Sequence, residues 1–258
     1  MTAFYLKLLA VISMLIDHTG IVLYDHKVIA WDPYLIMRVL GRFAFPIYAF
    51  LLAEGFRHLR DDPERLRKHA LLLLVLAALS ELPFDWMSHG VIHNIENQNV
   101  IFTLLFGFLG LWLSDVYRDR PLLRGGIWLL AVTMGWFVNT DYGAAGVLLV
   151  FLSSIYLERV EDRSIGLRLL GVLGVICGYY AFYTWAHVSF GGPRAIWERL
   201  VAMRYYLMPH LLLIPVLAAY RGERGPKIPF LHRCYQWFYP AHLALLCLIG
   251  LLLDKTLP

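Results

Sequence analysis

The chain has 258 residues, of which 59% are apolar and 16% charged, and its mean hydropathy is +0.60. Soluble domains carry about 25% charged residues, so the composition excludes an ordinary soluble enzyme. The net charge of +4 lies in short segments between apolar runs, a pattern that sets membrane topology and excludes a nucleic-acid-binding footprint. Three cysteines, Cys177, Cys234 and Cys247, form no close pair, so we expect neither a disulfide framework nor a metal site.

Membrane-spanning helices need about 20 mainly apolar residues, and nine stretches of the chain approach that length. In chain order they are 4–24, 35–56, 67–86, 99–117, 123–140, 142–158, 165–185, 203–220 and 236–254. The sequence therefore predicts an all-α polytopic membrane bundle of about nine helices (eight to ten), forming a single domain over 1–258. Pro46, Pro209 and Pro215 lie inside spans and predict kinks.

Basic residues alternate between the loops, which predicts an N-terminus inside and a C-terminus outside. The seventh loop, with Arg194, Arg199 and Arg204, breaks this pattern. The basic loops follow the second, fourth, sixth and eighth spans and hold Arg57, Arg60, Arg65, Arg67, Lys68, Arg118, Arg120, Arg124, Arg159, Arg163, Arg221, Arg224, Lys227 and Arg233. The first span has Lys7 as its one early cation and is interrupted by Asp17 and His18, so we expect it to be retained rather than cleaved as a signal peptide.

Ionisable groups at membrane depth are costly and therefore mark candidate functional sites. The predicted topology gathers a set of them towards the outer face: Asp17, His18, Arg38, Arg42, Glu81, Asp85, Asn97, Gln98, Asn99, Asn139, Asp141 and Tyr142. Such a cluster predicts a polar cavity open to the outside. The alternative is a purely structural role, in which single members lie at the headgroup level or pair with each other.

His18 is the sharpest candidate, because imidazole is the usual general base near neutral pH. Its neighbour Asp17 lies about 100° away around the helix, so the imidazole needs an orienting group from another helix. Glu81, Asp85 and Asp141 qualify. Lys7 precedes His18 by 11 positions, close to three turns, which places both side chains on one face about 16 Å apart.

Several segments together resemble the TraX family, named for a protein linked to N-terminal acetylation of conjugative pilin. They are KLLA (7–10), MLIDHTG (14–20), GRFAFPIYAFLLAEGF (41–56), SELPFD (80–85), QNVIFT (98–103), DYGAAG (141–146) and FYPAH (238–242). The family is in turn similar to transmembrane acyltransferases, whose first helix carries a basic residue, ten intervening residues and a histidine. Lys7 and His18 fit that spacing, although lysine stands where the acyltransferase-3 branch normally has arginine.

The resemblance implies transfer of an acetyl group from cytosolic acetyl-CoA to an amine or hydroxyl at the outer face, on a pilin amino terminus or a glycan. His18 would act as base or acyl carrier, beside Asp17. Glu81, Asp85 or Asp141 would orient it, and Arg42 or Asn99 would stabilise the oxyanion. The expected donor site comprises Lys7, Arg57, Lys68, Tyr239 and His242, with the last two at the inner mouth of the ninth span; Glu54 and His210 are weaker candidates.

Two other functions remain open from the sequence. Membrane carboxylates and histidines also build proton relays, which would suit a proton-coupled transporter of small solutes. A non-catalytic assembly factor of a surface or conjugation apparatus is the third hypothesis, and it would tolerate the loss of Lys7 and His18. The pilin analogy implies a bacterial inner membrane.

Overall fold

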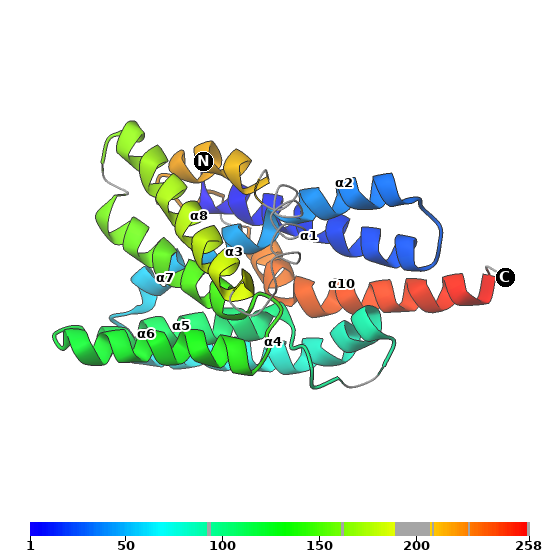
Figure 1. Cartoon of the computed structure of the whole chain (residues 1–258), viewed down its shortest axis with the longest axis horizontal. Helices are drawn as coiled ribbons and strands as arrows, with labels where there is room; N and C mark the ends of the chain where they lie inside the picture. The colour runs from blue at the N-terminus through cyan, green and yellow to red at the C-terminus, as the bar shows by residue number, and fades with distance from the viewer. Residues whose placement is uncertain (92–93, 161–162, 189–206, 208, 227, 257–258) are drawn as a thin grey trace.

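The computed structural model describes all residues except 92–93, 161–162, 189–206, 208, 227 and 257–258 (Figure 1). The described part is helical, apart from one isolated backbone bridge between Gln98 and Thr140. The helices are α1 (Ala3–Asp25), α2 (Trp31–Gly41), α3 (Ala44–Leu59), α4 (Pro63–His89), α5 (Val100–Val116), α6 (Pro121–Phe137), α7 (Gly143–Arg159), α8 (Ile165–Val188), α10 (Pro229–Thr256) and an unlabelled segment, Pro209–Ala218.

Length and hydropathy confirm the predicted all-α membrane bundle. Five stretches of the described chain are long and apolar enough to cross a bilayer: Ala3–Asp25, Trp31–Leu59, Pro63–Ser88, Ile165–Trp185 and Cys234–Lys255. Helices α5 and α6 and the segment Pro209–Ala218 are apolar but shorter. The predicted span 203–220 falls partly outside the described residues, which cover 207 and 209–220 of it.

The predicted span 35–56 is two helices, not one kinked helix. A turn at Arg42 and Phe43 separates α2 from α3. Pro46 is the third residue of α3, where a missing N–H is tolerated because the first turn of a helix has no intrahelical acceptors for it. The proline therefore marks the start of a new helix, and the turn before it lets α2 pack along α1.

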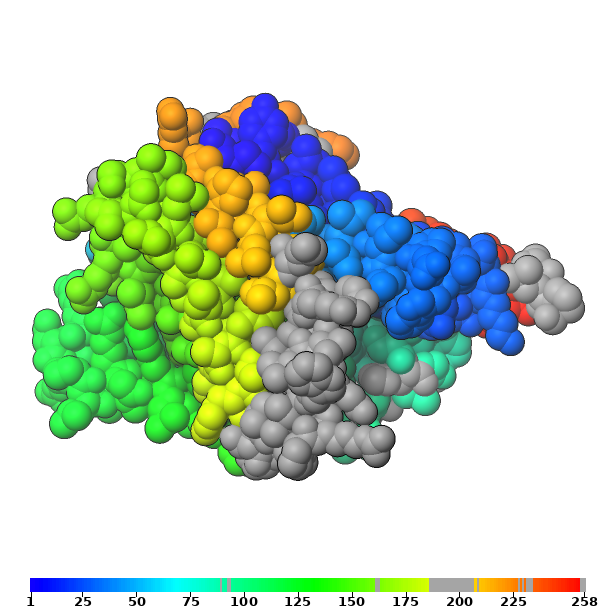
Figure 2. Space-filling view, turned by 45° about the horizontal axis from the view of Figure 1, so that its top comes forward, coloured from blue at the N-terminus to red at the C-terminus, as the bar shows by residue number. Residues whose placement is uncertain are grey.

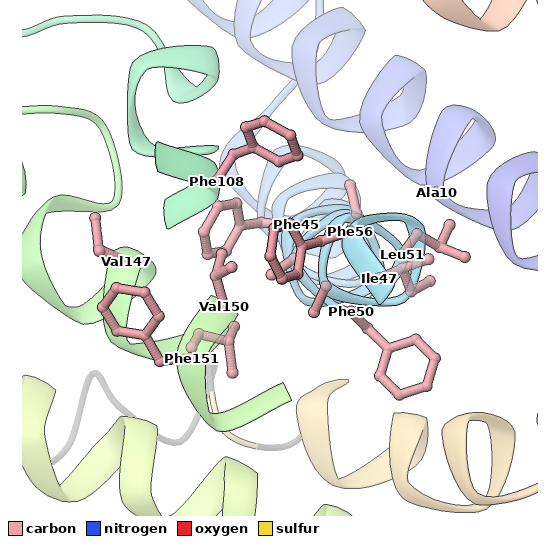
Figure 3. Close-up of a cluster of buried hydrophobic side chains, with 14 of the residues drawn as sticks. Ala10, Phe45, Ile47, Phe50, Leu51, Phe56, Phe108, Val147, Val150 and Phe151 are labelled. Atoms are coloured by element: carbon pink, nitrogen blue, oxygen red, sulfur yellow. The ribbon is translucent and has the colours of Figure 1, made fainter. Parts of the chain in front are cut away.

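Helix α3 forms the centre of the bundle and packs against α1, α4, α5 and α7. Its side chains radiate in all directions, with Phe45, Phe50 and Phe56 each at most 4% exposed. Figure 3 shows α3 between Ala10 of α1 and the side chains of α7, including Phe151, with Phe50 pointing to another side. A helix that is apolar all round is expected at a core position, and α3 supplies the wall on which the site described below is built.

The two ends of the bundle agree with the predicted alternation of loops. At one end the N-terminal ammonium donates to the carbonyl of Ala219 (3.1 Å), and the N–H of Ala3 donates to the carbonyl of Glu223 (2.9 Å). Figure 2 shows the segment Pro209–Ala218 lying between α8 and the start of α1. At the other end of α1, His26 pairs with Asp254 of α10 (3.2 Å). Helices α1 and α10 thus run side by side in the same direction.

Candidate functional site

A cavity of about 430 Å³ lies inside the bundle, walled by α1, α2, α3, α4, α5 and α10. Six of the predicted site residues line it: Lys7, Asp17, His18, Arg42, Asp141 and Tyr239. They come from both ends of the sequence and from its middle. The cavity therefore brings together part of the predicted polar cluster, and Lys7 lines it from the other end of α1.

An ion pair joins α1 to α2 at the wall of this cavity. Arg38 Nη1 donates to Asp17 Oδ2 over 2.7 Å, and Asp17 is only 9% exposed. The other carboxylate oxygen, Oδ1, is buried and has no hydrogen-bond partner among the described residues. Gly41 permits this approach, because a Cβ there would lie 2.3 Å from the Asp17 side chain. Arg38 was in the predicted polar cluster but not in the proposed site; it lies one turn before Arg42, which caps the end of α2, and both line the cavity.

His18 pairs with another histidine. Its Nδ1 lies 2.7 Å from Nε2 of His242, and Nδ1 of His242 lies 2.8 Å from the carbonyl oxygen of Phe238. The two imidazole planes differ by 3° while their centres are 4.9 Å apart. With so short a distance between nitrogens, the rings meet edge to edge in nearly one plane. His242 is 4% exposed and belongs to the site, so its predicted place at the inner mouth of the ninth span is wrong.

Glu81 and Asp85, two of the three carboxylates expected to orient His18, accept hydrogen bonds from other residues. Glu81 accepts from the side-chain amide of Asn99, and Asp85 accepts from the N–H of Asn94 (2.7 Å). The same Asn99 amide donates to the carbonyl of Ala77 (2.8 Å), and its side-chain oxygen caps the start of α5. Both amide hydrogens are therefore occupied, which contradicts the predicted oxyanion role of Asn99. Glu81 and Asn99 thus join α4 to the start of α5, Asp85 holds the connection between the two helices, and none of the three lines the cavity.

Two backbone hydrogen bonds position Asp141 at the wall of the cavity. The N–H of Asp141 donates to the carbonyl of Gln98 (2.8 Å), and the N–H of Gln98 donates to the carbonyl of Asn139 (3.0 Å). Asn139 has a positive φ of 52°, which asparagine tolerates better than most residues. This pairing holds the turn between α6 and α7 against the start of α5, beside the turn that separates α2 from α3.

A second cavity, of about 570 Å³, adjoins the first at the N-terminal end of α1. After the predicted topology, we name this second one the inner cavity and the first one the outer cavity. Its cationic and imidazole side chains are Lys7, His58, His69, Arg65 and Arg224. Lys7 and His69 line both cavities, as do several apolar and aromatic residues. The two cavities therefore share a boundary. We name the end lined by Lys7, Arg65 and Arg224 the basic mouth, and His18 lies on the other side of the boundary.

Two residues predicted for the donor site lie elsewhere. Neither Arg57 nor Lys68 lines either cavity, and Lys68 is exposed and pairs with Glu64 one turn earlier on α4 (2.6 Å). Their neighbours His58 and Arg65 face the inner cavity instead. The string 57–68 spans the end of α3 and the start of α4, and only the helix bounds decide which of its basic residues turn inward.

Glu54 is the buried carboxylate of the inner cavity. It is 7% exposed, accepts from the hydroxyl of Tyr220 (2.6 Å) and lies 3.0 Å from Nε2 of His58. His210, the other weaker candidate from the sequence, lies in the core and contacts the hydroxyl of Tyr180. Glu54 therefore belongs to the basic mouth, whereas His210 lines none of the cavities described.

Comparison with known proteins agrees with these motifs. The family model described as TraX protein matches residues 3–250. The chain is also similar to the "Probable fimbrial assembly protein FimC, serogroup H1" of Dichelobacter nodosus, with 26% identity over 255 residues that cover 95% of this chain and 94% of that protein. No solved structure matches. Because the family match covers nearly the whole chain, the chain belongs to the TraX family.

Proposed function

We propose that this protein is a membrane-embedded acyltransferase that takes an acetyl group from cytosolic acetyl-CoA. The acceptor is an amine or hydroxyl at the outer face, with a pilin amino terminus as the first candidate by family analogy. The observation that carries the proposal is the pair of adjoining cavities, with cations at one end and His18 at the other. In this arrangement the chain resides in a bacterial inner membrane with the basic mouth facing the cytosol.

The inner cavity supplies the chemistry that a phosphorylated donor needs. Lys7, Arg65 and Arg224 present ammonium and guanidinium groups, which form charge-assisted hydrogen bonds to phosphate oxygens. The 11 positions from Lys7 to His18 rise about 16 Å along α1. An extended thioester arm anchored at the mouth would follow this face of α1 towards His18.

The outer cavity supplies a base and a cation for the transfer step. His18 removes a proton from the acceptor nitrogen or oxygen as its lone pair attacks the thioester carbonyl. The new C–N or C–O bond forms, the C–S bond breaks, and the CoA sulfur leaves with the proton that His18 returns. Arg42 lines the same cavity and in this proposal stabilises the oxyanion that develops on the carbonyl.

A non-catalytic role in pilus assembly is the competing hypothesis, and the printed name of the Dichelobacter nodosus relative favours it. The two hypotheses make opposite demands on His18. An assembly factor needs it only for packing, whereas an acyltransferase needs its nitrogen lone pair. Substitution by glutamine keeps a polar side chain of similar size but removes the base.

The test uses purified protein in detergent, radiolabelled acetyl-CoA and a synthetic pilin N-terminal peptide, with the N-terminally blocked peptide as acceptor control. Lys7→Ala should weaken acetyl-CoA binding about tenfold or more, since a hydrogen bond to a charged group contributes about 1.5–3 kcal/mol. Arg118→Ala is the matched control, because Arg118 is an exposed cation that lines neither cavity.

His18→Gln should leave acetyl-CoA binding intact and lower the transfer rate by about 10²–10⁴-fold. Absence of saturable acetyl-CoA binding in calorimetry at millimolar donor would refute the proposal. Full transfer by His18→Gln would refute the role of His18. Restoration of pilus assembly in cells by a transfer-dead His18→Gln protein would favour the assembly hypothesis.

A further inference from the structure

The hydrogen-bonded series from Phe238 through His242 to His18 fixes where the hydrogens lie. We infer that His242 is a positioning residue that holds His18 as the tautomer with hydrogen on Nδ1, so that Nε2 of His18 is the basic nitrogen. The inference deepens the proposed function and rests on it for its catalytic part. Its structural part concerns only the hydrogens of the two rings and can be tested separately.

The assignment begins at the carbonyl of Phe238, which can only accept. Nδ1 of His242, at 2.8 Å, must therefore carry hydrogen. In a neutral imidazole the other nitrogen is then an acceptor, so Nε2 of His242 accepts. Its partner at 2.7 Å, Nδ1 of His18, must be the donor. The nearly coplanar rings direct that N–H along the lone pair of His242.

Burial keeps His242 neutral in the resting protein. The residue is 4% exposed, and no carboxylate in the described part of the chain bonds to it. An imidazolium there would be a buried charge without an anion, which is strongly unfavourable. Had His242 been charged, both its nitrogens would donate and His18 would be forced into the opposite tautomer. Neutrality therefore decides the direction of the hydrogen bond between the rings.

The consequence for His18 is a lone pair on the side of the ring that is not bonded to His242. His18 lines the outer cavity, and none of the described residues hydrogen-bonds to its Nε2. A proton taken from the acceptor enters at Nε2. The hydrogen on Nδ1 of His18 stays bonded to Nε2 of His242, so the second ring remains neutral and accepts from the imidazolium of His18. Transfer of the proton from Nε2 to the leaving sulfur restores the starting tautomer.

The hydrogens can be observed directly by ¹⁵N NMR of protein labelled at its ten histidines, with the His18 signals assigned by their loss in His18→Gln. In the wild type we expect a protonated Nδ1 and an unprotonated Nε2 at His18. His242→Gln keeps a carbonyl acceptor and should preserve this pattern. His242→Leu removes the acceptor and should shift His18 towards the Nε2–H form. Observation of the Nε2–H form in the wild type, or an unchanged pattern in His242→Leu, would overturn the inference.

Kinetics supply the second readout, on the acetyl-transfer assay described above. His242→Leu should lower kcat roughly 10–100-fold, part of the 10²–10⁴-fold that a positioned base contributes, with KM for acetyl-CoA unchanged. His242→Gln should recover most of that loss. The control is His26→Leu, a histidine that caps the end of α1 and pairs with Asp254. If the wild type shows the expected tautomers but transfers no acetyl, the proposed function fails while the assignment of hydrogens stands.

Discussion

Replacement of Gly41 by alanine tests the close contact between α2 and the Asp17 side chain of α1. A Cβ at this position would lie 2.3 Å from Cβ, Cγ and Oδ1 of Asp17. The clash includes the first carbon of the Asp17 side chain, which no rotamer change can move. Helices α1 and α2 must therefore separate, and overpacking of this kind costs about 1–3 kcal/mol. At roughly 2–4 °C per kcal/mol for a chain near this size, the thermal midpoint should fall by about 2–12 °C.

The assay is thermal unfolding in detergent, followed by tryptophan fluorescence. Gly174→Ala is the control, since nothing lies within 4 Å of a Cβ at that position in α8. Alanine favours helix over glycine by about 1 kcal/mol, so the control midpoint should stay or rise. In an Asp17→Gly background, Gly41→Ala should lose most of its effect. If Gly41→Ala behaves like the control, α1 and α2 are not packed at this distance.

Three further substitutions give distinct outcomes. Arg38→Leu leaves the buried Asp17 carboxylate without its partner and should destabilise the protein by roughly 3 kcal/mol, measured by chemical unfolding in detergent; a loss below about 0.5 kcal/mol would contradict the pairing. Tyr220→Phe removes the hydrogen bond to Glu54 and should cost about 1.5–3 kcal/mol in the same assay, so an unchanged midpoint would exclude that bond. Asn99→Ala removes a helix cap worth about 1 kcal/mol but should keep the acetyl-transfer rate per folded molecule; a hundredfold loss would return Asn99 to the catalytic site.

Composition and periodicity were enough for the membrane bundle but not for the break between α2 and α3. The stretch 35–56 is apolar throughout, and hydropathy does not register a turn whose residues, Arg42 and Phe43, are flanked by apolar neighbours. The signal was Pro46, which is compatible with both a kink and a helix start. Only the packing of α2 against α1 distinguishes them.

The sequence predicted the part of the site that lies on one helix, but not the contacts between helices that are distant in the chain. Spacing along one helix predicted that Lys7 and His18 share a face, and both line the outer cavity. The contact between His18 and His242 spans 224 positions, and no local pattern encodes it. The predicted ninth span began at 236, whereas α10 begins at Pro229, about 10 Å earlier along the axis. That shift moves His242 from the mouth of the helix to the depth of His18.

The uneven lengths of the helices have a consequence for the bilayer itself. Helices α5, α6 and α7 have 17 residues each and rise about 25 Å, less than the roughly 30 Å of hydrocarbon, whereas α1 has 23 residues and α10 has 28. Hydrophobic mismatch on one flank thins the surrounding lipid there. The turn that carries Asp141 joins α6 to α7 and so lies on that short flank. If this turn faces outside, as the sequence predicts, a membrane-anchored acceptor of the proposed reaction would meet the cavity through thinner lipid.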